Sequence, residues 1–119
     1  MRPLLLLAAA AAAASTLASA AVASSPPARA QVSADEFTLA LSRSWIHHGQ
    51  AIIELVNYGE DDHDLALRRV GGTRIYRIGI VHPGTTGDLE ARLRPGRYTL
   101  WCTLAGHRGR GMQATLRVT

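Results

Sequence analysis

Between residues 31 and 119, short runs that alternate apolar and polar residues are separated by glycine or proline about every ten residues. This period of two is typical of half-buried β-strands, and no long apolar period of 3.6 residues indicates a helix. The alternation predicts strands over 37–42, 51–57, 63–68, 89–94, 97–102 and 112–118. Residues 73–82 suit either a strand or an extended loop. Short strands at this spacing predict an all-β fold, a β-sandwich.

The chain opens with the layout of a secretory signal peptide. Arg2 supplies one positive charge, residues 4–14 contain only leucine and alanine, and the stretch to Ala30 is rich in alanine and serine. The apolar run is shorter than the ~20 residues that a membrane-spanning helix needs, although an uncleaved anchor is the alternative. We expect a signal over residues 1–30, cleaved after Ala30 or, as second choice, Ala23. The protein is then periplasmic or otherwise exported, without a membrane span.

Length and charge exclude several classes of protein. Residues 31–119 are enough for one domain with a modest core, and too few for an enzyme with a cleft between two domains. The whole chain has a formal charge of +4, and aromatic residues make up 5% of it. The arginines form no basic run and are hardly interleaved with aromatic residues, so we expect no nucleic-acid binding.

The chain has a single cysteine, Cys102. In an exported protein a lone cysteine cannot form an intrachain disulfide, so it is inert and buried, linked to another chain, or a metal ligand. The alternation places His63, Cys102 and Met112 on the inward, apolar faces of three separate strands. His107 lies in the glycine-rich loop between the last two. We therefore expect these four side chains to gather at one end of the sandwich.

The loop has the pattern Cys-x4-His-x4-Met, and His63 lies 39 residues before the cysteine. Two imidazoles and a thiolate in a trigonal plane, with a distant axial thioether, form a blue-copper electron-transfer site. Glycines at 106, 109 and 111 are expected to let the loop bring three ligands around one ion. The alternatives are that Cys102 and Met112 are core residues and that His63 is a hydrogen-bonded core histidine.

Two segments resemble the cupredoxins, the small blue copper proteins, and the resemblance covers residues 33–119. NYGEDDHDL at 57–65 is similar to the family's N-x-G-x-x-x-H segment, and PGRYTLWCTLAGHRGRGM at 95–112 is similar to its P-G-x-Y-x-x-x-C…H…M ending. The x4/x4 ligand loop is similar to that of rusticyanin. The resemblance implies a Greek-key β-sandwich that binds one type 1 copper ion through four ligands: His63, Cys102, His107 and Met112.

The chain departs from the family beside the ligands. The family often has Asn after the first ligand histidine and Ser or Thr after the cysteine, and these two residues hydrogen-bond to each other. Here the pair is Asp64 and Thr103. An ionised Asp64 accepts a hydrogen bond from the Thr103 hydroxyl but cannot donate one. Its negative charge is expected to favour Cu(II) and to lower the reduction potential.

The remaining candidate residues are assigned to the surface. His47 and His48 are adjacent, so on a strand they face opposite ways and chelate poorly. His82 precedes a proline, and Glu60–Asp62 lacks the spaced ligands of a calcium loop, which favours a solvated turn. Trp101 has outward parity, and it either packs on the sheet or offers an exit for electrons beside the cysteine.

The leading function is an exported carrier of single electrons, and not an enzyme. A copper oxidase or a nitrite-reductase-like enzyme needs a second copper centre, and the family's oxidases have His-Cys-His where this chain has Trp101 and Thr103 around the cysteine. A carrier that delivers copper more often uses exposed Met and His clusters, which are absent. A cupredoxin-like module without metal is the remaining alternative, although all four ligands are present.

The predicted partners are redox proteins. Arg108 and Arg110 flank His107 and give this end of the molecule a local positive charge. We expect the ring edge of His107 to be the electron port, acidic partners to dock there, and the carrier to be a monomer. Steering of this kind speeds encounter more than it increases affinity.

Overall fold

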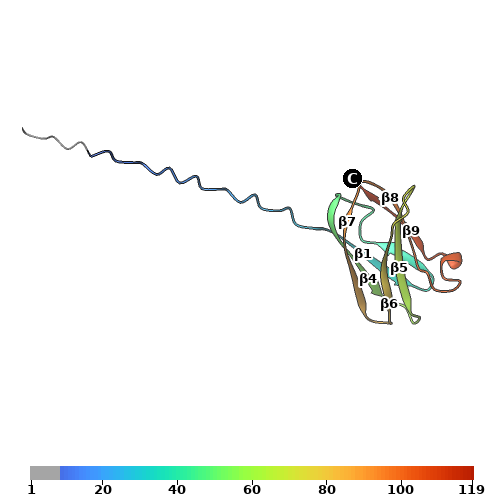
Figure 1. The fold of residues 1–119 in the computed structure, drawn as a ribbon. Helices are drawn as coiled ribbons and strands as arrows, with labels where there is room; N and C mark the ends of the chain where they lie inside the picture. Colours follow the sequence, from blue (N-terminus) through green and yellow to red (C-terminus); the bar gives the residue numbers. More distant parts are fainter. Residues whose placement is uncertain (1–8) are drawn as a thin grey trace, which may run out of the picture.

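The computed structural model describes residues 9–119, and the part from residue 28 onward forms two packed β-sheets (Figure 1). Residues 1–8, which hold the charged start of the predicted signal and the first part of its apolar run, lie outside the described residues. Nine strands are described: β1 (Ala28–Asp35), β2 (Thr38–Leu41), β3 (Trp45–Ile46), β4 (Gly49–Asn57), β5 (His63–Arg69), β6 (Ile75–Val81), β7 (Thr86–Leu93), β8 (Gly96–Trp101) and β9 (Gln113–Val118). A 3-10 turn, Arg108–Arg110, precedes β9.

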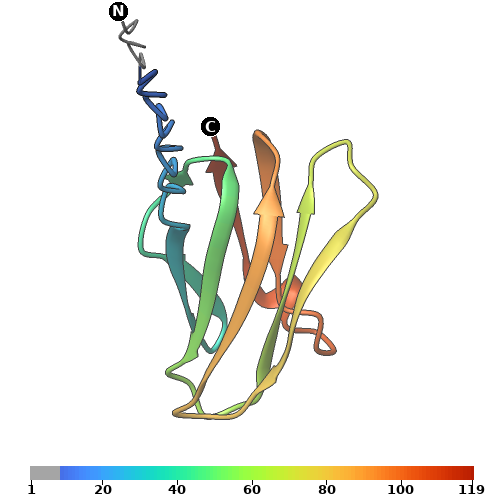
Figure 2. The same ribbon diagram turned by 60° about the vertical axis from the view of Figure 1, so that its left-hand side comes forward.

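The two sheets have four and five strands. Their orders are β2-β1-β4-β7 and β3-β9-β8-β5-β6. Neighbouring strands are antiparallel, except that β1 pairs in parallel with β4 and β3 in parallel with β9. The chain passes from one sheet to the other on each side of β3. It crosses again between β4 and β5 and on each side of β7, as Figure 2 shows. The predicted all-β Greek-key sandwich is therefore confirmed.

Inward side chains of both sheets form one apolar core. In β1 every second residue is buried, namely Ala30, Val32 and Ala34, and β4 and β8 repeat the pattern. This alternation is the period of two that predicted the strands. Among the described residues, the buried polar side chains are Asn57 and His63, which lie at the same end of the sandwich. That end carries the metal-binding candidates.

The structure resolves the uncertain segment 73–82 and adds strands that the sequence did not reveal. Residues 75–81 form β6, which pairs with β5. The unpredicted strand β1 begins at Ala28, whose partner in β4 is Ala51, and Ala30 is buried opposite Ile53. The predicted cleavage point after Ala30 thus falls inside β1, whereas cleavage after Ala23 leaves the strand whole.

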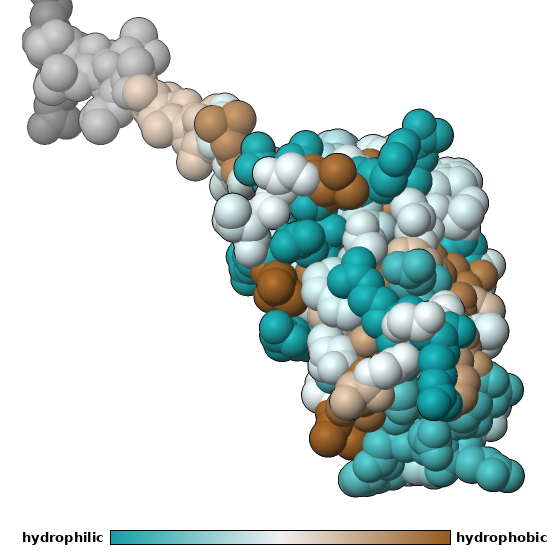
Figure 3. Space-filling model, turned by 90° about the vertical axis from the view of Figure 1, so that its right-hand side faces the viewer, coloured by the Kyte–Doolittle hydropathy of each residue, from teal (hydrophilic) through white to brown (hydrophobic). Residues whose placement is uncertain are grey.

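Residues 9–27 form neither helix nor strand and extend away from the sandwich (Figure 1). In residues 9–119 no helix has the length and apolar character needed to cross a membrane. The face in Figure 3 is mostly hydrophilic, with hydrophobic residues in separate small patches. The large hydrophobic side chains exposed on the sandwich are scattered in the same way: Trp45, Tyr58, Val70, Ile75 and Ile80.

Candidate metal centre

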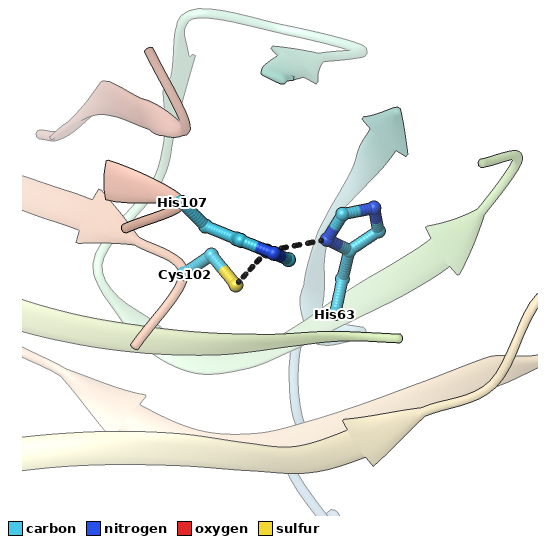
Figure 4. Close-up of side chains that lie close together, drawn as sticks. All are labelled: His63, Cys102 and His107. Atoms are coloured by element: carbon cyan, nitrogen blue, oxygen red, sulfur yellow. Dashed lines mark hydrogen bonds between the residues drawn. The ribbon is translucent and has the colours of Figure 1, made fainter. Parts of the chain in front are cut away.

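Three of the predicted ligands meet at one end of the sandwich. The Nδ1 atoms of His63 and His107 are 3.3 Å apart, and the Cys102 Sγ lies 3.6 Å from the Nδ1 of His107. One ligand atom from each residue lies within 4.8 Å of the others. Figure 4 shows the two rings and the sulfur facing a common point from separate segments. His63 and Cys102 are fully buried, and His107 is half-buried.

These separations fit a metal ion. A trigonal ion with metal–nitrogen bonds of about 2.0 Å and a metal–sulfur bond of about 2.3 Å places its ligand atoms about 3.5 to 3.8 Å apart. The His63–His107 distance of 3.3 Å lies slightly below this range, and the Cys102–His107 distance of 3.6 Å lies within it. Two imidazoles with one thiolate are the ligand set of blue copper. The cluster therefore has the donor atoms of such a site; two of their three separations are close to the expected spacing, and the third is within 4.8 Å.

His63 is held by the loop between β4 and β5. Asn57, at the end of β4, donates from Nδ2 to the carbonyls of Asp61, at 2.7 Å, and Val81, at 2.9 Å. Its Oδ1 accepts the N–H of Gly59 at 2.8 Å. One buried amide thereby fixes the loop at both ends and ties it to β6. This is the role of the asparagine in the N-x-G-x-x-x-H segment.

The ligand loop is closed by its own backbone. The N–H of Cys102 donates to the carbonyl of Met112 at 3.1 Å, and the N–H of Met112 donates to that of His107 at 3.2 Å. Gly106 and Gly111 have φ of +80° and +125°, which a side chain rarely adopts, and confirm the need for glycine. Gly109, in contrast, lies in the 3-10 turn without a positive φ, so the expectation for this third glycine was wrong.

Met112 is the predicted axial ligand. Its side chain is completely buried and belongs to the same core cluster as Cys102. Because its backbone bonds directly to Cys102 and His107, the residue lies immediately beside the three clustered ligands. Burial in the core agrees with both of its expected roles, axial ligand and packing residue.

The predicted contact between Asp64 and Thr103 is present. The Asp64 carboxylate accepts the Thr103 backbone N–H at 2.6 Å and also the Thr103 hydroxyl. It therefore connects the start of β5, where His63 lies, to the residue after Cys102.

Burial raises the pKa of the Cys102 thiol, so the metal-free protein holds this thiol protonated at neutral pH. Metal binding has to release that proton.

The structure adds one residue that the sequence did not reveal, Glu36, in the turn between β1 and β2. Its carboxylate accepts a hydrogen bond from the Nε2 of His63 at 3.0 Å and from the backbone N–H of Asp61 at 2.7 Å and of Glu60 at 3.0 Å. Led by the Asp61 N–H, these donors lower the pKa of Glu36 to about 2. A lone acid in a turn far from the ligands gives no signal in the sequence.

The other imidazole reaches the surface. Every buried side-chain nitrogen or oxygen in residues 9–119 has a hydrogen-bond partner, and the bonds of His107 all use Nδ1. Its Nε2 edge is therefore open to solvent. Around it, the guanidinium of Arg108 lies 4.8 Å from the ring centre of Trp101, and that of Arg110 lies 4.8 Å from the ring centre of Phe37. Trp101 is half-buried, with the guanidinium of Arg108 over its ring.

The residues assigned to the surface are there. His47, His48 and His82 are exposed, and His82 bonds through Nδ1 to the Asp62 carboxylate at 2.7 Å. The acidic turn Glu60–Asp62 is fixed through the backbone N–H groups of Glu60 and Asp61, which donate to Glu36. The cluster of possible metal ligands found in residues 9–119 does not include this turn. A hollow of about 690 Å³ lies at the opposite end of the sandwich. None of the four candidate ligands lines this hollow. Its lining includes four arginines: Arg69, Arg74, Arg92 and Arg94.

Comparisons with known proteins agree with this architecture. No protein-family model matches the chain, and no curated protein matches it by sequence. Among solved structures, auracyanin A, a "blue" copper protein from Chloroflexus aurantiacus, matches with a TM-score of 0.63 and 14% identity over 79% of this chain and 100% of that one. A purple cupredoxin from Nitrosopumilus maritimus matches with a TM-score of 0.54 and 16% identity, over 76% and 99% of the two chains. A multicopper oxidase matches with a TM-score of 0.60 and 15% identity, over 79% of this chain but 45% of its own. The chain therefore has the cupredoxin fold.

Proposed function

We propose that this chain is an exported blue copper protein that carries single electrons through one type 1 copper ion. Its proposed ligands are His63, Cys102, His107 and Met112. The observation that carries the proposal is the approach of two imidazole Nδ1 atoms, 3.3 Å apart, and one cysteine sulfur, 3.6 Å from one of them. When bound, copper supplies the change between Cu(II) and Cu(I), which takes one electron from a donor and gives it to an acceptor.

The protein contributes a fixed set of ligand positions. The register of β5 with β6 holds His63, and the backbone bonds of the loop hold Cys102, His107 and Met112. Thiolate and thioether favour Cu(I), whereas imidazole accepts Cu(II), so one geometry serves both states. The solvent-facing Nε2 edge of His107 offers the shortest connection from the site to a docked protein.

An enzymatic role is less well supported. A copper oxidase needs a second copper centre with its own histidines, and the three that remain, His47, His48 and His82, are exposed and away from the cluster. The matching oxidase chain is also more than twice as long as the matched region. Export, a monomeric state and acidic redox partners are parts of the same proposal, supported by the apolar leader and by Arg108 and Arg110.

The test is the visible spectrum of the protein after addition of Cu(II). We expect an intense thiolate-to-copper charge-transfer band and a type 1 EPR signal. Cys102→Ser should remove the band, because a hydroxyl cannot replace the soft thiolate, while His82→Ala, the surface control, should keep it. Copper binding without this band in the wild-type protein would contradict the proposal.

A further inference from the structure

The contact between Glu36 and His63 carries an inference that the ligand set alone does not give. The Nε2 of His63 lies on the far side of the ring from the cluster, and it meets the Glu36 carboxylate at 3.0 Å. The imidazole is fully buried, so water does not compete for this nitrogen. The Glu36 side chain is 24% exposed, and its second oxygen accepts the backbone N–H of Glu60 at 3.1 Å.

This contact selects one form of the imidazole. An ionised carboxylate only accepts hydrogen bonds, so Nε2 of His63 must carry the proton. In the neutral ring Nδ1 is then bare, and its lone pair points toward Cys102 and His107. Glu36 thereby holds the ring in the tautomer that a metal ion needs. The negative carboxylate also makes Nδ1 of the imidazole a stronger electron-pair donor toward a metal ion.

The carboxylate is itself held rigidly. Besides His63, it accepts the backbone N–H groups of Glu60 and Asp61. Gly59 makes room for it, because a Cβ there would lie 2.3 Å from the Glu36 Oε1. The turn between β1 and β2 is therefore fastened to the loop that carries His63. A fixed carboxylate can orient a ligand, whereas a mobile surface acid cannot.

The next residue extends the same turn to the second imidazole. The ring of Phe37 stands edge-on to that of His107, with 5.1 Å between ring centres. Its carbonyl also approaches Gly111, where a Cβ would lie 2.9 Å away. The β1–β2 turn thus contacts both histidines of the cluster, one through a charged hydrogen bond and one through an aromatic contact.

We infer that Glu36 is a positioning residue for the metal centre, which sets the tautomer of His63 and stabilises Cu(II) relative to Cu(I). The inference rests on the proposed function, since it assumes that His63 binds copper. Removing the charge while keeping the acceptor should raise the reduction potential. Removing both should also weaken metal binding, and loss of such a partner of a ligand histidine typically costs 10–100-fold in affinity.

Three variants of the full-length protein separate these effects. Glu36→Gln keeps an oxygen acceptor for Nε2 but has no charge. Glu36→Ala removes both. Asp62→Asn is the matched control. It also removes one carboxylate, but the Asp62 carboxylate bonds to His82 and not to a proposed ligand. We expect the charge-transfer band to persist in Glu36→Gln and Asp62→Asn.

The first readout is the reduction potential. A tenfold loss of the preference for Cu(II) over Cu(I) raises a one-electron potential by about 59 mV. We expect a rise of about this size in Glu36→Gln and a clearly smaller one in Asp62→Asn. Equal potentials in these two variants would show that Glu36 acts only as one more surface charge, and would overturn the inference.

The second readout needs no copper. In metal-free protein labelled with ¹⁵N, the ring nitrogens of His63 should show the Nε2–H tautomer in the wild type and in Glu36→Gln. They should show a mixture of tautomers in Glu36→Ala. An unchanged tautomer in Glu36→Ala would overturn the inference. A wild-type protein that shows this tautomer but gives no blue band would overturn the proposed function, and with it the effect on Cu(II), while the control of the His63 tautomer by Glu36 would stand.

Discussion

Replacing Asn57 by alanine tests how firmly the fold holds the first ligand. The buried amide makes three hydrogen bonds, two from Nδ2 to the carbonyls of Asp61 and Val81 and one to Oδ1 from Gly59. Each such bond contributes about 1 kcal/mol net, and a buried carbonyl left without a partner costs about 1 to 3 kcal/mol more. We therefore expect the free energy of unfolding to fall by about 4 kcal/mol, out of the roughly 5 to 15 kcal/mol of a small domain.

Urea unfolding of the metal-free protein measures this loss, with linear extrapolation to water. Gln50→Ala is the matched control, since Gln50 is exposed on the same strand. Asn57→Asp keeps the acceptor for Gly59 but sets a carboxylate oxygen against the carbonyls of Asp61 and Val81, so it should lose at least as much stability as the alanine variant. If all three variants lie within about 1 kcal/mol of the wild type, the loop is not held by this side chain.

Three further predictions concern the axial ligand, the first strand and docking. Met112→Leu should keep the blue band and raise the reduction potential, and Met112→Gln should lower it; equal potentials would assign Met112 to the core. A chain of residues 31–119 lacks three paired residues of β1, so its free energy of unfolding should be about 2 kcal/mol lower than that of residues 24–119; equal urea midpoints would contradict this. Arg108→Glu with Arg110→Glu should slow electron transfer with an anionic partner and flatten its salt dependence, measured by stopped flow; an unchanged rate and salt slope would exclude steering by these arginines.

The part of the site predicted from the sequence depended on strand parity. Leu100 and Cys102 share a parity, and so do Leu65 and His63, because successive side chains of a strand alternate between faces. The apolar partners marked the inward face, and the ligands on the same face had to be buried. The structure buries both Cys102 and His63 completely. Parity therefore predicted burial and convergence without any knowledge of how the two sheets pack.

Contacts between distant segments left no comparable pattern. β1 was not predicted because its inward residues at the start, Ala28 and Ala30, are alanines that continue the composition of the leader. Once β1 was missed, the turn after it could not be placed, and Glu36 remained an unassigned acid. Its contact with His63 spans 27 residues and depends on the parallel pairing of β1 with β4. No local periodicity encodes a pairing of that kind.

The arrangement of hydrogen bonds indicates that the metal site is largely formed before an ion arrives. The loop from Cys102 to Met112 is closed by backbone bonds, and Asp64 connects it to β5. His63 is held from behind by Glu36. Because these contacts belong to the protein and not to the metal, they persist in either oxidation state of a bound ion. Ligands held in this way move little when one electron is added or removed. A small movement lowers the barrier to electron transfer, so the same contacts that stabilise the fold also suit the site for the proposed reaction.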